Sequence, residues 1–331
     1  MHIMKAESPG PSVSKLVPRV RTTAMILYAL YMALTVIEFI FLLCGRMSVF
    51  DALNTAFSTA GTGGFGVRND GMAGYSNYLQ TVVTVFMLLF SINFGCYYLL
   101  LLRRVREAFN AEVRVFLLIV AAAVAVITVD LRLNGVINSV TGESFTLYGA
   151  IHHAAFTVSS LISTTGYATA DFDLWPALSK TVLVGVMFLG ACAGSTGGGI
   201  KVSRILILCK SIRREIEGLV HPHRVRRITM DRRVVDTDVI RSTNVYFVAY
   251  VLLFAVSVLL ISFDDFDLVT NFTAVTASLN NVGPGLSLVG PTRNFALFST
   301  ASKVVLIFDM LAGRLELFPM LALLVPSTWK D

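Results

Sequence analysis

Charged side chains are scarce in this chain. Only 15% of its 331 residues are Asp, Glu, Lys or Arg, whereas 55% are hydrophobic. Soluble domains carry nearer a quarter charged residues, so this chain has too little polar surface to cover a globule in water. The scarcity of charge excludes an ordinary soluble protein and predicts a chain that lies in a membrane.

Cysteine is also rare, and its few thiols lack the spacing of metal ligands. The four cysteines, Cys44, Cys96, Cys192 and Cys209, lie in or beside apolar runs, so we expect free, buried thiols and no cofactor. The sequence also lacks a catalytic set at membrane depth: neither a nucleophile with a base and an orienting group nor a pair of acids lies within the apolar runs. An intramembrane enzyme is therefore disfavoured.

The surplus of positive charge is confined to particular turns. Lys and Arg number 27 against 21 Asp and Glu, and the basic residues lie before the first apolar run, at 103–114 and at 201–241. This distribution argues against nucleic-acid binding and predicts that these turns face the cytoplasm. The opposite ends carry acids that either attract cations or are simply solvated: Asp70, Glu143, Asp171, Asp173, Asp264, Asp265 and Asp267.

One order of elements recurs three times: an apolar span, a polar turn, an amphipathic half-span, a glycine segment and a second apolar span. Several apolar runs reach the roughly 20 residues that cross a bilayer. Such repetition predicts a pore or transporter built from copies of one unit. The expected spans are 20–43, 78–102, 113–133, 175–209, 240–262 and 294–326, and the expected half-helices are 49–60, 146–163 and 266–279.

Each half-helix is followed by a glycine among small, hydroxyl or amide residues. Glycine permits the positive φ angles that aim successive carbonyls the same way, and converging carbonyls can replace the water around an alkali cation. The half-helices are expected to run inward, so the negative ends of their dipoles favour a cation over an anion. The expected carbonyl ligands belong to Thr62, Gly63, Gly64, Thr164, Thr165, Gly166, Tyr167, Asn281, Val282, Gly283 and Pro284.

A second cluster of glycines interrupts the expected span at 175–209. Each glycine costs roughly 1 kcal/mol in a helix interior, so this run should unwind near mid-membrane. Close packing of helices through small residues is one alternative. A phosphate-binding loop is another, but it is disfavoured because Ile200 separates the last glycine from Lys201. The run contains Gly190, Gly194, Ser195, Thr196, Gly197, Gly198 and Gly199.

Together these motifs resemble the TrkH/KtrB superfamily of potassium transporters, and its TrkH branch in particular. The resemblance implies an all-α polytopic membrane protein, with helix–pore-loop–helix units around a pseudo-fourfold pore. It also implies potassium as the transported ion and contact with membrane lipid. The matching segments are 6–11 (AESPGP), 58–67, 163–171 (STTGYATAD), 194–201 (GSTGGGIK), 280–285 (NNVGPG) and 311–316 (LAGRLE).

Further implications of the resemblance concern assembly. It implies a homodimer in the cell (inner) membrane and a cytoplasmic, nucleotide-binding regulatory subunit of the TrkA type. Only three of the four repeats are expected in this chain. Three repeats cannot close a fourfold ring of carbonyls. The alternative function is therefore a non-conducting fragment that only binds partners. The expected repeats are 1–110 with a pore loop at 49–66, 111–235 with a pore loop at 146–170, and 236–331 with a pore loop at 266–286.

The resemblance finally implies a gate beneath the filter, formed by an intramembrane loop at 190–201 that includes residues 194–199. Arg314 lies within the last apolar run. An arginine inside a span costs roughly 2.5–3.5 kcal/mol, so it should face water or a partner. Our hypothesis is that Arg314 contacts the loop at 192–200 in the closed state. The alternative is that it pairs with Glu316 or Asp309.

Overall fold

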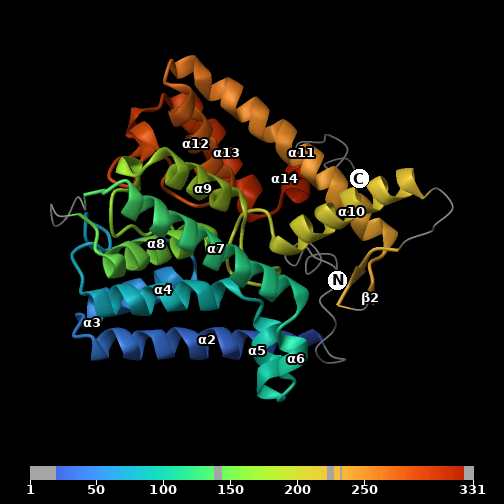
Figure 1. The fold of residues 1–331 in the computed structure, drawn as a ribbon, viewed down its shortest axis with the longest axis horizontal. Coiled ribbons are helices and arrows are strands. Elements are labelled where there is room, and N and C mark those ends of the chain that lie inside the picture. Colours follow the sequence, from blue (N-terminus) through green and yellow to red (C-terminus); the bar gives the residue numbers. More distant parts are fainter. Residues whose placement is uncertain (1–19, 138–143, 222–226, 232, 324–331) are drawn as a thin grey trace.

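The chain folds into a bundle of helices (Figure 1). A computed structural model describes residues 20–137, 144–221, 227–231 and 233–323. In this part the only strands are β1 (Thr229–Met230) and β2 (Arg233–Val234), which pair antiparallel. The expected all-α class is therefore confirmed. The predicted segment 6–11 and Glu143 lie outside the described residues.

Among the described residues, three single helices are long and apolar enough to cross a membrane. They are α2 (Val20–Cys44), α7 (Ala111–Leu133) and α11 (Thr237–Ile261). Many of their large apolar side chains are exposed, which suits a helix whose surroundings are acyl chains. These helices confirm the expected spans at 20–43, 113–133 and 240–262.

Each spanning helix is followed by a shorter helix that begins at a side-chain cap. These half-helices are α3 (Val49–Ala60), α8 (Leu147–Ile162) and α12 (Leu268–Leu279). Their caps, Ser48, Thr146 and Asp267, accept hydrogen bonds of 3.0–3.1 Å from the amide three residues on. A cap of this type satisfies an amide that has no partner within the helix. All three half-helices therefore begin with the same kind of side-chain N-cap.

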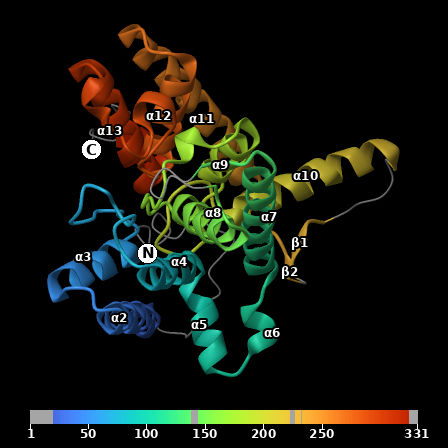
Figure 2. The same ribbon diagram turned by 60° about the vertical axis from the view of Figure 1, so that its left-hand side comes forward.

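The helices pack as three similar units, each with a spanning helix, a half-helix and a helix that follows it. The units are α2, α3 and α4 (Asn77–Ser91); α7, α8 and α9 (Ala177–Phe188); and α11, α12 and α13 (Thr300–Arg314). The last helix of one unit packs on the half-helix of the next, α4 on α8 and α9 on α12 (Figure 2). Repetition of this contact brings the ends of the half-helices toward one another.

The expected span at 78–102 divides into α4 and α5 (Phe94–Leu101), which are bent by 91° but together are long and apolar enough for one broken span. Asn93 Oδ1 accepts from Gly95 N at 2.7 Å and so starts α5 in a new direction. The freed carbonyl of Ser91 accepts from the amide of Cys192 at 3.0 Å. A distant segment thus satisfies the backbone at the bend, and this contact has no local signal in the sequence.

The remaining elements connect these units. The expected run at 294–326 also divides, into α13 and α14 (Leu317–Leu323), and α10 (Val202–Val220) projects from the bundle. In Figure 1, α6 (Val105–Ala108), α10 and β2 gather at one end of the molecule, where the basic turns were expected to face the cytoplasm. Short 3₁₀ turns are Phe172–Leu174, Ser262–Asp264, Ser287–Val289 and Phe295–Leu297.

Candidate ion filter and gate

The three glycine segments share one backbone conformation. In each segment a residue with positive φ is followed, two positions later, by a glycine with positive φ. This alternation turns successive carbonyls toward the same side. The φ angles are 53° and 69° at Thr62 and Gly64, 59° and 85° at Thr164 and Gly166, and 56° and 106° at Asn281 and Gly283.

Matching hydrogen bonds fix each segment to the end of its half-helix. The amides of Gly63, Thr165 and Val282 donate to carbonyls five residues earlier, at 2.7, 2.9 and 2.8 Å respectively. These bonds use carbonyls that have no partner within the helix, as in other left-handed helix ends. The three segments are therefore in register, and each one begins at the negative end of a helix dipole.

The segments lie against one another. A methyl group on Gly64 would overlap the carbonyl oxygen of Thr165, and a methyl group on Gly166 would overlap that of Val282. The first segment therefore contacts the second, and the second contacts the third. The structure brings together the backbones that the sequence predicts to form the filter.

The described residues form an open arc of segments rather than a closed ring. A methyl group placed on Gly283 would have only Gly166 Cα within 4 Å, apart from its own chain neighbours. Beside the first segment, Phe65 is 81% exposed, whereas Thr165 and Val282 are buried. The open side lies between the first and third segments, as expected for three arcs of a fourfold arrangement.

Tyr167 differs from its predicted role as a carbonyl ligand. Its carbonyl accepts from Ser160 Oγ at 2.6 Å and therefore faces α8. Its hydroxyl donates to the carbonyl of Phe65 at 3.1 Å, and the side chain is buried. The side chain of Tyr167 thus ties the second segment to the first.

The glycine-rich run between α9 and α10 is unwound, as the sequence predicts, and lies beneath the segments. Gly198 N donates to Thr164 Oγ1 at 2.7 Å. A methyl group on Gly197 would lie 3.0 Å from the carbonyl oxygen of Ser163, and one on Gly198 would lie 2.8 Å from that of Asn280. This loop, residues 189–201, is named the gating loop after the role predicted for it, and it packs against the ends of two half-helices.

Arg314 joins the gating loop to the first segment. Its Nη1 lies 3.1 Å from Thr196 O and 3.3 Å from Thr62 Oγ1, and its Nη2 lies 3.3 Å from Gly61 O. The predicted contact with the loop is thus confirmed. The alternative partners are engaged elsewhere, since Glu316 pairs with Arg204 and Asp309 accepts from Ser257. A guanidinium at this position puts positive charge directly below the carbonyls.

An ion pair that the sequence did not predict joins Arg204 to Glu316, two residues after Arg314 in the chain. Arg204 Nη2 lies 2.7 Å from Glu316 Oε2, and the guanidinium stacks over the ring of Tyr246 at 3.8 Å. Glu316 has a φ of 74° at the break between α13 and α14. The sequence does show one arginine and one glutamate of opposite charge, Arg204 and Glu316, in apolar runs. That they pair could not be predicted, because only the fold brings α10 beside the break between α13 and α14.

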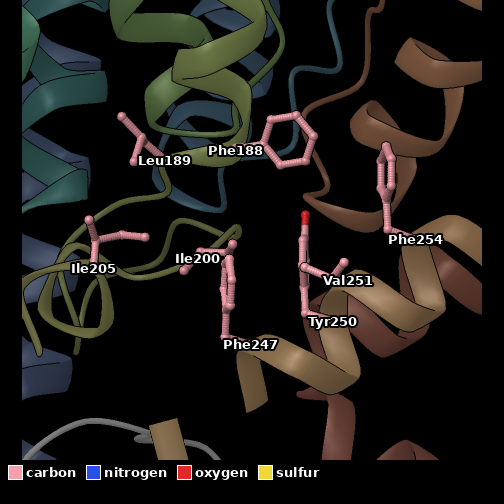
Figure 3. A pocket seen from close by; sticks show the side chains of 8 residues that line it. All are labelled: Phe188, Leu189, Ile200, Ile205, Phe247, Tyr250, Val251 and Phe254. Atoms are coloured by element: carbon pink, nitrogen blue, oxygen red, sulfur yellow. The ribbon is translucent and has the colours of Figure 1, made fainter. Parts of the chain in front are cut away.

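An apolar cavity of about 280 Å³ lies beside both ends of the gating loop (Figure 3). Leu189 and Ile200 lie at the two ends of the loop and form an isolated β-bridge. The hydroxyl of Tyr250 donates to Asn280 Oδ1 at 2.9 Å, so it is already satisfied. The cavity therefore offers no unpaired hydroxyl to a polar ligand. Its walls are Phe188, Leu189, Ile200, Ile205, Phe247, Tyr250, Val251 and Phe254.

Comparison with known proteins agrees with this geometry. The family model TrkH, described as a cation transport protein, matches residues 2–330. The chain belongs to the TrkH family. As a member of that family it is a multi-pass membrane protein of the transporter class rather than an enzyme.

TrkH-family relatives match along almost the whole chain. It is 36% identical to the Trk system potassium uptake protein TrkH of Salmonella typhimurium, over 100% of this chain and 68% of the relative. It is 30% identical to TrkG of Escherichia coli, over 99% and 67% respectively. The crystal structure of the potassium transporter TrkH from Vibrio parahaemolyticus superposes with a TM-score of 0.85 at 32% identity, over 99% of this chain and 70% of that one.

Proposed function

We propose that this chain forms the ion-conducting part of a potassium uptake system in the cell (inner) membrane. The observation that carries the proposal is the repeated pair of left-handed residues in three segments that lie side by side. Carbonyls held in this way can take over the hydration shell of a potassium ion. The names of the relatives support potassium as the ion.

In this proposal the gating loop and Arg314 close the path. The loop fills the space under the second and third segments, and Arg314 adds a positive charge under the first. A cation that leaves the carbonyls would meet both a steric block and a like charge. Conduction therefore requires the loop and the guanidinium to move aside.

We also propose a homodimer and a cytoplasmic, nucleotide-binding regulatory subunit of the TrkA type. The term Trk system in the relatives' names supports a multi-component assembly. Helix α10 offers exposed apolar side chains, Ile212, Ile216 and Leu219, next to the basic residues Lys210 and Arg213. Such a mixed surface at the cytoplasmic end suits a protein partner or anionic lipid.

Growth of a host that lacks potassium uptake tests the proposed function. The gene is expressed both as this chain and with the coding sequence upstream of Met1, because the chain spans 68% of a relative. Rescue at low potassium by either form supports potassium uptake, and rescue only by the longer form would show that residues 1–331 do not conduct alone. Failure of both forms, with protein present in the membrane, would contradict the proposal.

A further inference from the structure

Helix α10, which follows the gating loop, has no cap of its own. Its N-cap residue is Lys201, and no side chain within the helix caps it. A lysine ammonium only donates, so it cannot satisfy the free amides at a helix start. The acceptor comes instead from another helix, since Ser203 N donates to Glu112 Oε1 at 3.1 Å.

The same carboxylate oxygen also holds the beginning of the loop. Ala193 N donates to Glu112 Oε1 at 2.8 Å. One atom therefore binds the backbone on both sides of the stretch 194–202, which contains Thr196. Glu112 is buried, with 5% of its surface exposed. A buried amide that loses its acceptor is costly, so these two bonds hold the loop to α7.

Glu112 is itself held firmly, because it lies in the first turn of α7. Asn110 caps that helix by accepting from Val113 N at 2.9 Å. The Ala111 amide donates to Asp231 Oδ1, in the turn between β1 and β2, also at 2.9 Å. The β1–β2 hairpin is in turn fixed to α10, since Lys210 Nζ donates to Thr229 O at 2.6 Å. The carboxylate therefore acts from a rigid base at the cytoplasmic end.

We propose that Glu112 is a positioning residue of the gate, which holds both ends of the gating loop on one oxygen atom and so keeps Thr196 within reach of Arg314. This inference rests on the proposed function in assigning the loop to a gate. Without the carboxylate, the amides of Ala193 and Ser203 lose their acceptor. The loop then leaves its closed position, and the buried thiol of Cys192 becomes accessible.

The test measures how fast Cys192 reacts with a small, water-soluble thiol reagent. The full chain is purified with Cys44, Cys96 and Cys209 replaced by serine or alanine, so that Cys192 is the only thiol. Glu112→Ala removes the acceptor, Glu112→Asp shortens it by one methylene group, and Glu112→Gln keeps a neutral acceptor oxygen. The matched control is Glu107→Ala, which changes an exposed glutamate paired with Arg104 in the neighbouring helix α6.

We expect Glu112→Ala and Glu112→Asp to raise the labelling rate about fivefold or more, since a buried amide left unpaired is costly. Glu112→Gln should restore a rate near wild type, and Glu107→Ala should not change it. Because Gln has nearly the same shape as Glu, it provides a folded variant if the others fold poorly. Wild-type labelling in both Glu112→Asp and Glu112→Ala, or fast labelling in Glu112→Gln equal to that in Glu112→Ala, would overturn the inference.

Potassium flux through the same variants separates this inference from the proposed function. If the wild type carries flux and Glu112→Ala raises it together with the labelling rate, both stand. If the wild type and the longer chain carry no flux but labelling follows the expected order, the proposed function fails and the positioning role of Glu112 remains. If the wild type carries flux while Glu112→Ala changes neither measurement, the inference alone fails.

Discussion

The guanidinium of Arg314 and the carbonyl oxygen of Thr196 are hydrogen-bonded at 3.1 Å, although 118 residues separate them along the chain. This bond connects the end of α13 to the middle of the gating loop. Since Arg314 also contacts the carbonyl of Gly61, the same side chain connects the loop to the first segment. Arg314 therefore links the gating loop and the first segment directly.

Replacing Arg314 with Ala should raise potassium flux. A like charge a few ångströms from the ion costs roughly 1–4 kcal/mol, and the substitution also frees Thr196. We expect an increase of about tenfold, measured as uptake of potassium or rubidium into cells or vesicles. Arg314→Lys keeps the charge and should remain closer to wild type. Unchanged or lower flux in Arg314→Ala would count against a closing role.

Glycines at the contacts between segments should not tolerate a side chain. Gly64→Ala and Gly166→Ala place a methyl group against the carbonyls of Thr165 and Val282, at positive φ. Strain of about 1–3 kcal/mol should lower uptake by about tenfold or more. Gly185→Ala is the matched control, because nothing lies within 4 Å of its added methyl group. Normal uptake by Gly64→Ala and Gly166→Ala would show that these backbones do not line the ion path.

The ion pair between Arg204 and Glu316 should stabilise the fold more than exposed pairs do. Their side chains are only 9% and 18% exposed, and removing one partner of a buried pair costs about 3–5 kcal/mol. We therefore expect Glu316→Gln to lower the Tm of the detergent-solubilised protein clearly. Arg204→Lys should also lower it, because lysine loses the planar stack on Tyr246.

The control for that pair is Arg213 and Glu217, at 2.9 Å, with an arginine that is 76% exposed. A surface pair of this kind contributes about 0.3–0.5 kcal/mol, so Glu217→Gln should change the Tm little. Equal Tm losses in Glu217→Gln and Glu316→Gln would contradict the special role of the buried pair.

Asp267, in the turn between α11 and α12, should make stability depend on pH. Hydrogen bonds from the Thr270 hydroxyl and amide favour its ionised form and lower its pKa below the ordinary value of 3.8. A lowered folded-state pKa gives stabilisation that is present above the unfolded-state value and is lost as the pH falls through the folded-state value. Asp267→Ala should therefore cost about 1 kcal/mol at neutral pH, and this difference should shrink in acid.

Thermal unfolding at neutral and acid pH checks this prediction. Asp267→Asn supplies the control, since its amide oxygen still caps α12 without titrating. Its Tm should stay near that of the wild type at neutral pH. A difference between Asp267→Ala and wild type that persists unchanged in acid would mean that the carboxylate charge is not involved.

Local patterns in the sequence predicted much of this fold. The half-helix at 49–60 was predicted because an amphipathic stretch follows an apolar span and a polar turn, and a glycine segment follows it in turn. The unwinding of the gating loop followed from clustered glycines, whose cost in a helix is local. Features set by the conformation of one short segment are therefore readable without a structure.

Features that depend on distant contacts were not readable. The bend between α4 and α5 needs the amide of Cys192 to satisfy Ser91, and the position of Tyr167 needs Ser160 and Phe65. Glu112 gave no signal either, because a glutamate in a first helical turn is common. Its partners, the amides of Ala193 and Ser203, lie 81 and 91 residues further along the chain.

The most direct test of the account is to locate the ion itself. Crystals of the protein, grown in rubidium or thallium, would give anomalous density for a cation that stands in for potassium. We expect density on a common axis, in contact with the carbonyl oxygens of Gly63, Thr165 and Val282. Density elsewhere in the protein, or an ordered cation that none of these three carbonyls contacts, would contradict the claim that the three segments form one filter.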